Sequence, residues 1–216
     1  MDWIISPFQP VLRGKIVEIG IGHGSYCQIL SRQNEYIGID IDELSVQRAL
    51  ERFPGKRFAV CDILDEAALQ DTVPEGADAI LAINVLEHIA DDAAAVKNLV
   101  GLLRPGGHIC IAVPALQMLY NDLDRLAGHY RRYNLSQIGE ILRLRSVEVV
   151  RLSYFNPIGG FGWWLNSLKS HNSLNSNLMN NQIRAFERYV LPFSKMLDPL
   201  SRKFFGQSVI GIGRRI

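Results

Sequence analysis

Short apolar runs alternate with amphipathic segments along the first half of the chain. Residues 15–19, 36–40, 58–63, 79–85 and 108–114 are apolar and rich in β-branched side chains, which is typical of buried strands. Residues 25–31, 42–52, 65–71 and 91–103 carry apolar side chains at helical spacing. Because the two kinds of segment alternate with short connections, the pattern predicts an α/β fold with a doubly wound, mostly parallel sheet.

The pattern changes after residue 115. Residues 116–133 are polar and have no clear period, which predicts a long loop of the kind that is often functional. A helix over 135–145 should follow, capped by Asn134 with Gln137 three residues later. Residues 147–154 and 208–213 predict two more strands. Residues 156–206 then form an insertion, with a polar loop at 171–181 and amphipathic helices near 183–190 and 193–200. We expect one domain over 1–216.

A glycine-rich turn follows the first predicted strand. Gly20, Gly22 and Gly24 stand at alternate positions, so the backbone there can approach a ligand closely, and the next helix would point free N–H groups at that ligand. Asp40 ends the second strand twenty residues after Gly20, where a carboxylate can accept both hydroxyls of a ribose. The predicted ligand is a nucleoside-containing cofactor, either a dinucleotide or S-adenosylmethionine.

Three details favour S-adenosylmethionine. Ser25 stands where the dinucleotide fingerprint requires its third glycine. Glu18, two residues before Gly20, suits the ammonium group of a methionine moiety and would repel a pyrophosphate. Asp62, in the third strand, is placed to accept a hydrogen bond from an adenine amino group.

Five motifs in register resemble the class I S-adenosylmethionine-dependent methyltransferases. They are IVEIGIGHG, YIGIDID, FAVCDIL, AILAINVLEHI and LLRPGGHICIAVP, over about residues 13–115. The resemblance implies a Rossmann-like, seven-stranded sheet with an antiparallel last strand, S-adenosylmethionine as methyl donor and S-adenosylhomocysteine as product. The cofactor-binding residues that it implies are Glu18, Gly20, Ile21, Gly22, Gly24, Asp40, Ile41, Cys61, Asp62, Ile63, Asn84, Val85 and Leu86.

A narrower resemblance lies in the second half of the chain. GHYRRY at 128–133, YFNP at 154–157 and WWLN at 163–166 are similar to a bacterial subgroup of these methyltransferases associated with surface-polysaccharide or lipid-linked glycan synthesis. That subgroup usually has Gly-Phe where Ser146-Val147 stands here, so the turn should differ. The resemblance implies a small-molecule or lipid-linked glycan acceptor, with 116–133 and 156–206 as the walls of its pocket.

Two histidines are candidate catalytic bases. His88 follows the fourth strand, and His129 lies in the HYRRY cluster; either can remove a proton from the acceptor, or His88 can simply pack in the fold. Arginine pairs bind anions bidentately; the alternative is that the cluster forms structural salt bridges to Asp122, Asp124 and the sheet. The candidate substrate-binding residues are Tyr130, Arg131, Arg132, Tyr133 and Asn156.

Composition and charge limit which partners, locations and functions remain possible. A net charge of +1 over 216 residues gives no electrostatic support for nucleic-acid binding. The sequence has no 18-residue apolar run and no signal-peptide pattern, which predicts a cytoplasmic protein. Trp163 and Trp164 with nearby basic residues are compatible with peripheral membrane contact or a homodimer interface. We expect Cys27, Cys61 and Cys110 to be buried thiols. The sequence has no CxxC motif or His/Cys cluster that would indicate a metal site.

Two alternative functions remain from the sequence, a nucleotide-cofactor dehydrogenase and a non-catalytic cofactor-binding subunit.

Overall fold

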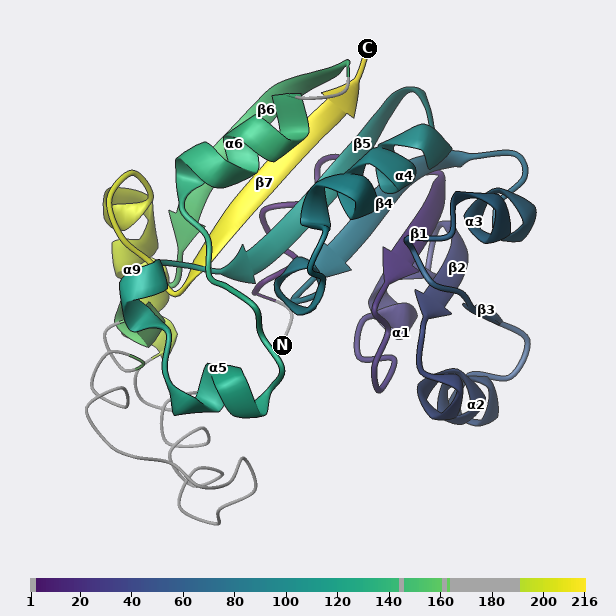
Figure 1. Cartoon of the computed structure of the whole chain (residues 1–216), viewed down its shortest axis with the longest axis horizontal. Helices are drawn as coiled ribbons and strands as arrows, with labels where there is room; N and C mark the ends of the chain where they lie inside the picture. The colour runs from purple at the N-terminus through teal and green to yellow at the C-terminus, as the bar shows by residue number, and fades with distance from the viewer. Residues whose placement is uncertain (1–2, 144–145, 161–162, 164–190) are drawn as a thin grey trace.

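Seven strands form one hydrogen-bonded sheet in the order β3-β2-β1-β4-β5-β7-β6 (Figure 1). The computed structural model describes residues 3–143, 146–160, 163 and 191–216. The strands are β1 (Lys15–Ile19), β2 (Glu35–Asp40), β3 (Arg57–Val60), β4 (Ala77–Ile83), β5 (Leu103–Pro114), β6 (Val147–Phe155) and β7 (Ser208–Arg215). The first five pair in parallel, whereas β7 runs antiparallel to β5 and β6. The predicted fold class, with an antiparallel last strand and an insertion before it, is confirmed.

Polar side chains fix the starts of most helices. The helices are α1 (Cys27–Leu30), α2 (Glu43–Arg52), α3 (Glu66–Thr72), α4 (Asp92–Leu102), α5 (Asp122–Leu126), α6 (Leu135–Arg143) and α9 (Leu191–Ser201), with 3₁₀ turns η1 (Leu86–His88) and η2 (Gln117–Leu119). Asp42, Asp65 and Asp91 each accept a backbone N–H from the residue three positions later, which satisfies donors that a helix start leaves unpaired. Asn134 and Gln137 cap α6 as predicted.

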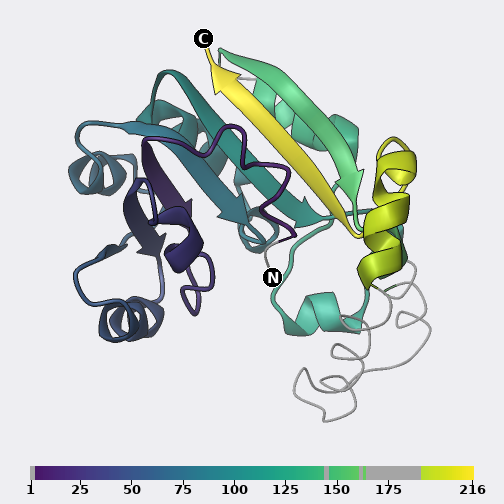
Figure 2. The same ribbon diagram turned by 180° about the vertical axis from the view of Figure 1, so that it is seen from behind.

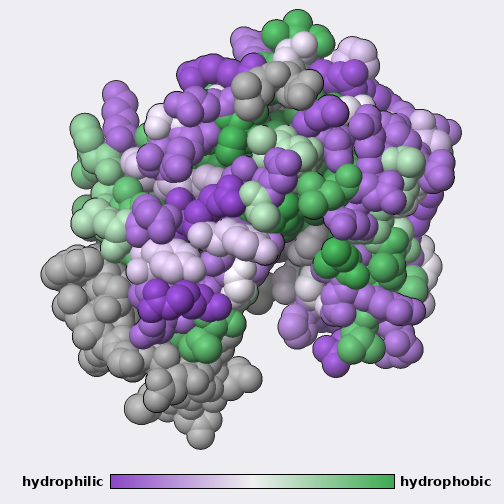
Figure 3. All heavy atoms as spheres, viewed as in Figure 1, coloured by the Kyte–Doolittle hydropathy of each residue, from purple (hydrophilic) through white to green (hydrophobic). Residues whose placement is uncertain are grey.

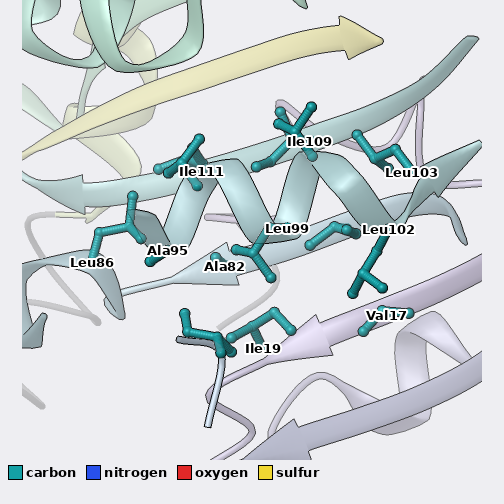
Figure 4. Packing of buried hydrophobic residues seen from close by; sticks show 14 of the residues in the cluster. Val17, Ile19, Ala82, Leu86, Ala95, Leu99, Leu102, Leu103, Ile109 and Ile111 are labelled. Carbon is teal, nitrogen blue, oxygen red and sulfur yellow. The ribbon is translucent and has the colours of Figure 1, made fainter. Parts of the chain in front are cut away.

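The central strands are buried on both faces because alternate side chains enter two different cores. Val17 and Ile80 pack on the face that α3, α4 and α6 cover, and Figure 4 shows Leu99 and Leu102 of α4 lying over β1 and β4. Their neighbours, such as Ile16 and Leu81, pack with α1 and the N-terminal segment, which crosses the opposite face (Figure 2). This double burial explains the nearly continuous apolar runs of these strands.

The N-terminal segment, described from residue 3 to residue 12, packs against the sheet. Ile5 and Phe8 are 1% and 0% exposed, and the rings of Trp3 and Phe155 have centroids 4.2 Å apart. The three cysteines are free and buried, as predicted. Among the helices that the structure describes, none combines the length and apolar character needed to cross a membrane.

Several boundaries differ from the prediction. β5 begins at Leu103 instead of 108, because Pro105–Gly107 continue the strand past a register shift opposite Ala77 and Ala79. The predicted loop 116–133 contains η2 and α5, which are too short to show a period in the sequence. The loop predicted at 171–181, the helix at 183–190 and Trp164 lie outside the described residues.

The carboxyl ends of the five parallel strands meet at one edge of the sheet, where open α/β sheets bind their ligands. The glycine turn, Asp40 and η1 all follow these strand ends. In the space-filling view, the molecule is hollowed at this edge between α5 and α2 (Figure 3).

Candidate active site

The glycine turn leaves open space where a ligand can lie. Gly20, Gly22 and Gly24 have φ of 70°, 49° and 67°, a region that residues with a Cβ rarely adopt. A Cβ at Gly20 would lie 2.5 Å from Val85 Cγ2, so the turn packs tightly against the end of β4. A Cβ at Gly22 would meet no atom within 4 Å. The backbone at Gly22 therefore borders a space that the described residues leave open, although the N–H groups of the three glycines are hydrogen-bonded within the protein.

Asp40 closes the second side of this space. Its Oδ2 accepts the Gly22 N–H at 2.9 Å, and its Oδ1 accepts the Asp42 N–H at 3.0 Å. Each carboxylate oxygen has a second lone pair, so the side chain is oriented by the backbone and can still accept hydroxyl donors.

Glu18 lies beneath the turn and is 3% exposed. Burial raises the pKa of this carboxyl to about 7, although the Tyr36 hydroxyl, which donates to Oε2 at 2.6 Å, opposes the shift. A cationic group placed nearby would favour the ionised form.

The segment after β3 is held by α4. Asn98 Nδ2 donates to the carbonyls of Ile63 and Leu64 at 3.1 Å, and Asp62 Oδ1 accepts the Leu64 N–H at 2.9 Å. Cys61 and Ile63 are each 6% exposed and belong to the core. Of these predicted cofactor residues, only Asp62 presents a polar side chain at the strand end.

The other predicted cofactor residues differ in exposure. Ile41 is 67% exposed beside Asp40, whereas Ile21 is buried against α2. Asn84 leaves β4 with a φ of 54°, and Val85 packs on Gly20. Leu86 is 0% exposed and faces α4 (Figure 4), so its predicted part in cofactor binding would have to come from its backbone.

His129 and Asp124 form a buried imidazole–carboxylate pair in the 116–133 segment. His129 Nδ1 lies 2.8 Å from Asp124 Oδ1, and the Asp124 side chain is 0% exposed. Burial acts to raise the pKa of Asp124, but hydrogen bonds from His129 and Arg132 outweigh it and lower that pKa. The ionised carboxylate places the proton of neutral His129 on Nδ1, so Nε2 is left as an acceptor.

Glu87 and His88 lie beside this pair. The His88 and His129 rings meet edge to face with centroids 4.6 Å apart. Burial, followed by the nearby His129, lowers the pKa of His88, against the effect of the Gly128 backbone. Glu87 is 0% exposed, and among the described residues neither of its carboxylate oxygens has a hydrogen-bond partner; burial raises its pKa to about 7.

The two arginines of the HYRRY cluster are paired within the protein, so the predicted arginine anion site is not formed. Arg132 is 2% exposed, binds Asp124 with Nε and Nη2, and lies over the Trp163 ring. Arg131 binds Asp92 Oδ2 at 2.9 Å and the Ala90 carbonyl at 2.7 Å. Of the two salt bridges considered as the alternative, the one to Asp124 is present, whereas Asp122 pairs with Arg125 instead.

The side chains of two more predicted substrate-binding residues are also hydrogen-bonded within the protein. Tyr133 is 1% exposed, and its hydroxyl donates to Asp92 Oδ2 at 2.7 Å. Asn156 bonds Gln207, Ser194 and the Gly159 N–H, which supports the end of β6. Both side chains have partners inside the fold, which argues against the substrate-binding role predicted for Tyr133 and Asn156. Tyr130 is 60% exposed and remains free to contact an acceptor.

Comparisons with known proteins agree with this arrangement. A family model described as a methyltransferase domain matches residues 17–109. A ubiquinone biosynthesis O-methyltransferase of Ralstonia nicotianae is 24% identical over 177 residues, which is 74% of each chain. An uncharacterized methyltransferase of Mycobacterium tuberculosis is 30% identical over 59% of this chain, which spans 64% of that relative's length. Crystalline N-methyltransferase NodS of Bradyrhizobium japonicum WM9, in complex with S-adenosylhomocysteine, superposes with a TM-score of 0.58 at 16% identity, covering 98% of this chain and 85% of NodS.

The chain is an S-adenosylmethionine-dependent methyltransferase. The five motifs of this methyltransferase lie on and directly after the strands β1–β5, and its cofactor is S-adenosylmethionine. The dehydrogenase alternative is thereby excluded. The polysaccharide-associated subgroup finds no counterpart among these relatives and stays an expectation.

Two residues of the candidate site, Glu87 and Asp124, were not predicted as site residues from the sequence. Glu87 was passed over beside His88, although a carboxylate directly after a buried strand was itself a signal. Asp124 was considered only as a salt-bridge partner of the arginines, and its bond to His129 depends on the fold of α5. Asn121 and Asp124 form a capping box there, and that pattern could have been read from the sequence.

Proposed function

We propose that this methyltransferase transfers a methyl group to a hydroxyl oxygen of a small-molecule acceptor. The single observation that carries the proposal is the His129–Asp124 pair, with Nδ1 and Oδ1 2.8 Å apart. A base with a free Nε2 is needed where the acceptor must lose a proton, and a carboxylate behind Nδ1 stabilises the imidazolium that forms.

In this proposal, the glycine turn and the strand ends hold the cofactor. Gly22 provides the open cradle, Asp40 accepts the ribose hydroxyls and Asp62 accepts from the adenine amino group. Glu18 faces the ammonium group. The space above Gly22 and the free lone pairs of Asp40 support this assignment.

The reaction is an in-line displacement. When bound, S-adenosylmethionine would supply a methyl group on a positive sulfur, and the electron pair of the broken carbon–sulfur bond would stay on sulfur as the bond to the acceptor oxygen forms. His129 Nε2 takes the hydroxyl proton and later releases it to water. The chain's main contribution is to hold acceptor and methyl group in line and to exclude water, since correct orientation alone can supply several kcal/mol of the barrier.

The acceptor is placed at the hollow between α5 and α2. The hydrogen bond from the Tyr130 N–H to the Glu87 carbonyl, at 2.7 Å, fixes the 116–133 segment over the end of β4. We assign the 116–133 segment and the 156–206 insertion to the acceptor side. The name of the Ralstonia relative favours oxygen as the methylated atom. A glycan hydroxyl could be methylated by the same chemistry. We do not assign recognition of an anionic group to Arg131 and Arg132, because both are paired with carboxylates of the protein.

Methylation assays with phenols, sugar nucleotides and lipid-linked sugars test the proposal. With an accepted hydroxyl compound, His129→Gln should lower the single-turnover rate by about 10²–10⁴-fold, while S-adenosylhomocysteine binds as in wild type. His108→Gln is the matched control, because it makes the same substitution at a histidine of β5 that pairs with Ala79 near the start of β4, away from the site. Methylation of amines alone, or an unchanged rate in the His129 variant, would refute the proposal.

A further inference from the structure

The least explained group in the described residues is the Glu87 carboxylate. Glu87 follows Leu86 in η1, and its side chain is completely buried. Neither carboxylate oxygen has a hydrogen-bond partner among the described residues. Buried polar atoms are hydrogen-bonded in almost all native proteins, so such an exception needs a reason. A ligand that the carboxylate binds directly would provide one.

The two histidines supply the rest of a ligand set. Glu87, His88 and His129 each offer one ligand atom, and these three atoms lie within 4.8 Å of one another. Glu87 is buried, whereas the His88 side chain is exposed. Ligands of a tetrahedral Zn²⁺ at about 2.0–2.1 Å from the metal are about 3.4 Å apart, so the three side chains would move closer together on binding an ion.

The surroundings of the histidines match those of metal ligands. A metal-binding histidine usually gives its second ring nitrogen to a carboxylate or backbone carbonyl, which fixes the tautomer. Asp124 takes this role for His129 Nδ1 at 2.8 Å, and Asp124 is itself held by Arg132. The His88 ring lies against the backbone of Gly128.

We propose that Glu87, His88 and His129 bind one divalent transition-metal ion, such as Zn²⁺. Two imidazoles and one carboxylate are a donor set that catalytic zinc sites use, with a fourth position open to water or substrate. Imidazole ligands favour this class over Mg²⁺, which prefers oxygen. The cluster contains neither a CxxC motif nor regularly spaced histidines, since η1 supplies two ligands and a distant segment supplies the third.

The role of the ion rests on the proposed function. An acceptor hydroxyl in the open position would lose its proton to water more readily, because a bound cation lowers the pKa of a coordinated oxygen. His129 would then act as a ligand in the metal-loaded protein and as the base in its absence.

Metal binding can be measured without any acceptor. Titration of the chelator-treated full chain with Zn²⁺, followed by calorimetry, and with Co²⁺, followed by its visible absorption, should give one equivalent bound. Glu87→Gln should weaken binding by roughly 100-fold or more, and His88→Ala by a similar factor. The control His108→Ala, which changes a histidine of β5, should bind as wild type does.

The outcomes separate the two proposals. Failure to bind near one equivalent, or equal affinity in wild type and in Glu87→Gln, would overturn the metal site and identify Glu87 as a buried protonated acid. If Glu87→Gln does not fold, His88→Ala decides the question, because that side chain is exposed. S-adenosylhomocysteine binding reports folding in every variant. Metal binding without methylation of any hydroxyl compound would refute the proposed function and leave the metal site standing.

Discussion

Arg132 and Asp124 form an ion pair that is almost completely removed from solvent. Arg132 Nη2 lies 2.9 Å from Asp124 Oδ1, and the side chains are 2% and 0% exposed. Asp124 also accepts the Asn121 N–H and pairs with His129. This one carboxylate therefore links the start of α5, the HYRRY cluster and the candidate base.

Arg132→Ala should destabilise the protein strongly. The substitution leaves the Asp124 charge buried without its main partner, and removing one member of a buried pair typically costs about 3–5 kcal/mol. Urea denaturation measures the change. Arg131→Ala is the control, since the Arg131 side chain is 32% exposed, and it should cost about 1 kcal/mol or less. Equal, small effects of both variants would contradict the structural role and return Arg132 to the acceptor site.

Asp40→Ala should weaken cofactor binding. If Asp40 accepts the ribose hydroxyls, its loss leaves them unpaired at a cost of about 1.5–3 kcal/mol, so S-adenosylhomocysteine should bind about tenfold or more weakly. Calorimetry provides the measurement. Asp42→Ala removes the neighbouring cap of α2, whose Oδ2 accepts the Ser45 N–H; it should lower stability by about 1 kcal/mol and leave affinity unchanged. Undiminished affinity in a folded Asp40→Ala variant would move the ribose site elsewhere.

Glu18 should make stability depend on pH. Its pKa is raised from 4.5 to about 7 by burial, so the folded state favours the protonated carboxyl. Its contribution is complete below pH 4.5 and is lost as pH rises to about 7, for a total of about 3 kcal/mol. Glu18→Gln keeps an acceptor for Tyr36 and does not titrate. The free energy of unfolding of this variant should therefore gain about 3 kcal/mol on wild type between pH 4 and pH 8, measured without ligand. A constant difference across that range would show that Glu18 is not perturbed.

The parts of the site that the sequence predicted are local. The glycine turn, Asp40 and Asp62 follow strands whose apolar runs are unambiguous, and parallel strands bring their carboxyl ends to one edge. Each residue could therefore be placed without knowledge of distant contacts. The register shift in β5 was not predictable in this way, because it depends on pairing with β4.

The acceptor side was predicted poorly for the opposite reason. A pair of adjacent arginines indicates an anion site only while their partners are unknown. Here, Asp92 is 39 residues from Arg131, and Asp124 is eight residues from Arg132 across an irregular segment. The same folding back of the segment brings His129 close to His88 and Glu87. For this reason, the cluster of these three residues could not be predicted from the sequence either.

Gly22→Ala should remove cofactor binding at little cost to the fold. Gly22 has a φ of 49° and open space beside it, so an added methyl group meets only the ligand. The left-handed backbone costs a residue with a Cβ about 1–2 kcal/mol. Gly55 is a matched control, because it has a φ of 81°, nothing within 4 Å of an added Cβ, and a place in the turn between α2 and β3. Both variants should lose a similar, small amount of stability in urea denaturation. Only Gly22→Ala should lose S-adenosylhomocysteine affinity, by at least about tenfold. If the two variants bind S-adenosylhomocysteine equally well, the cofactor does not approach the backbone at Gly22, and the cradle assigned to the glycine turn is wrong.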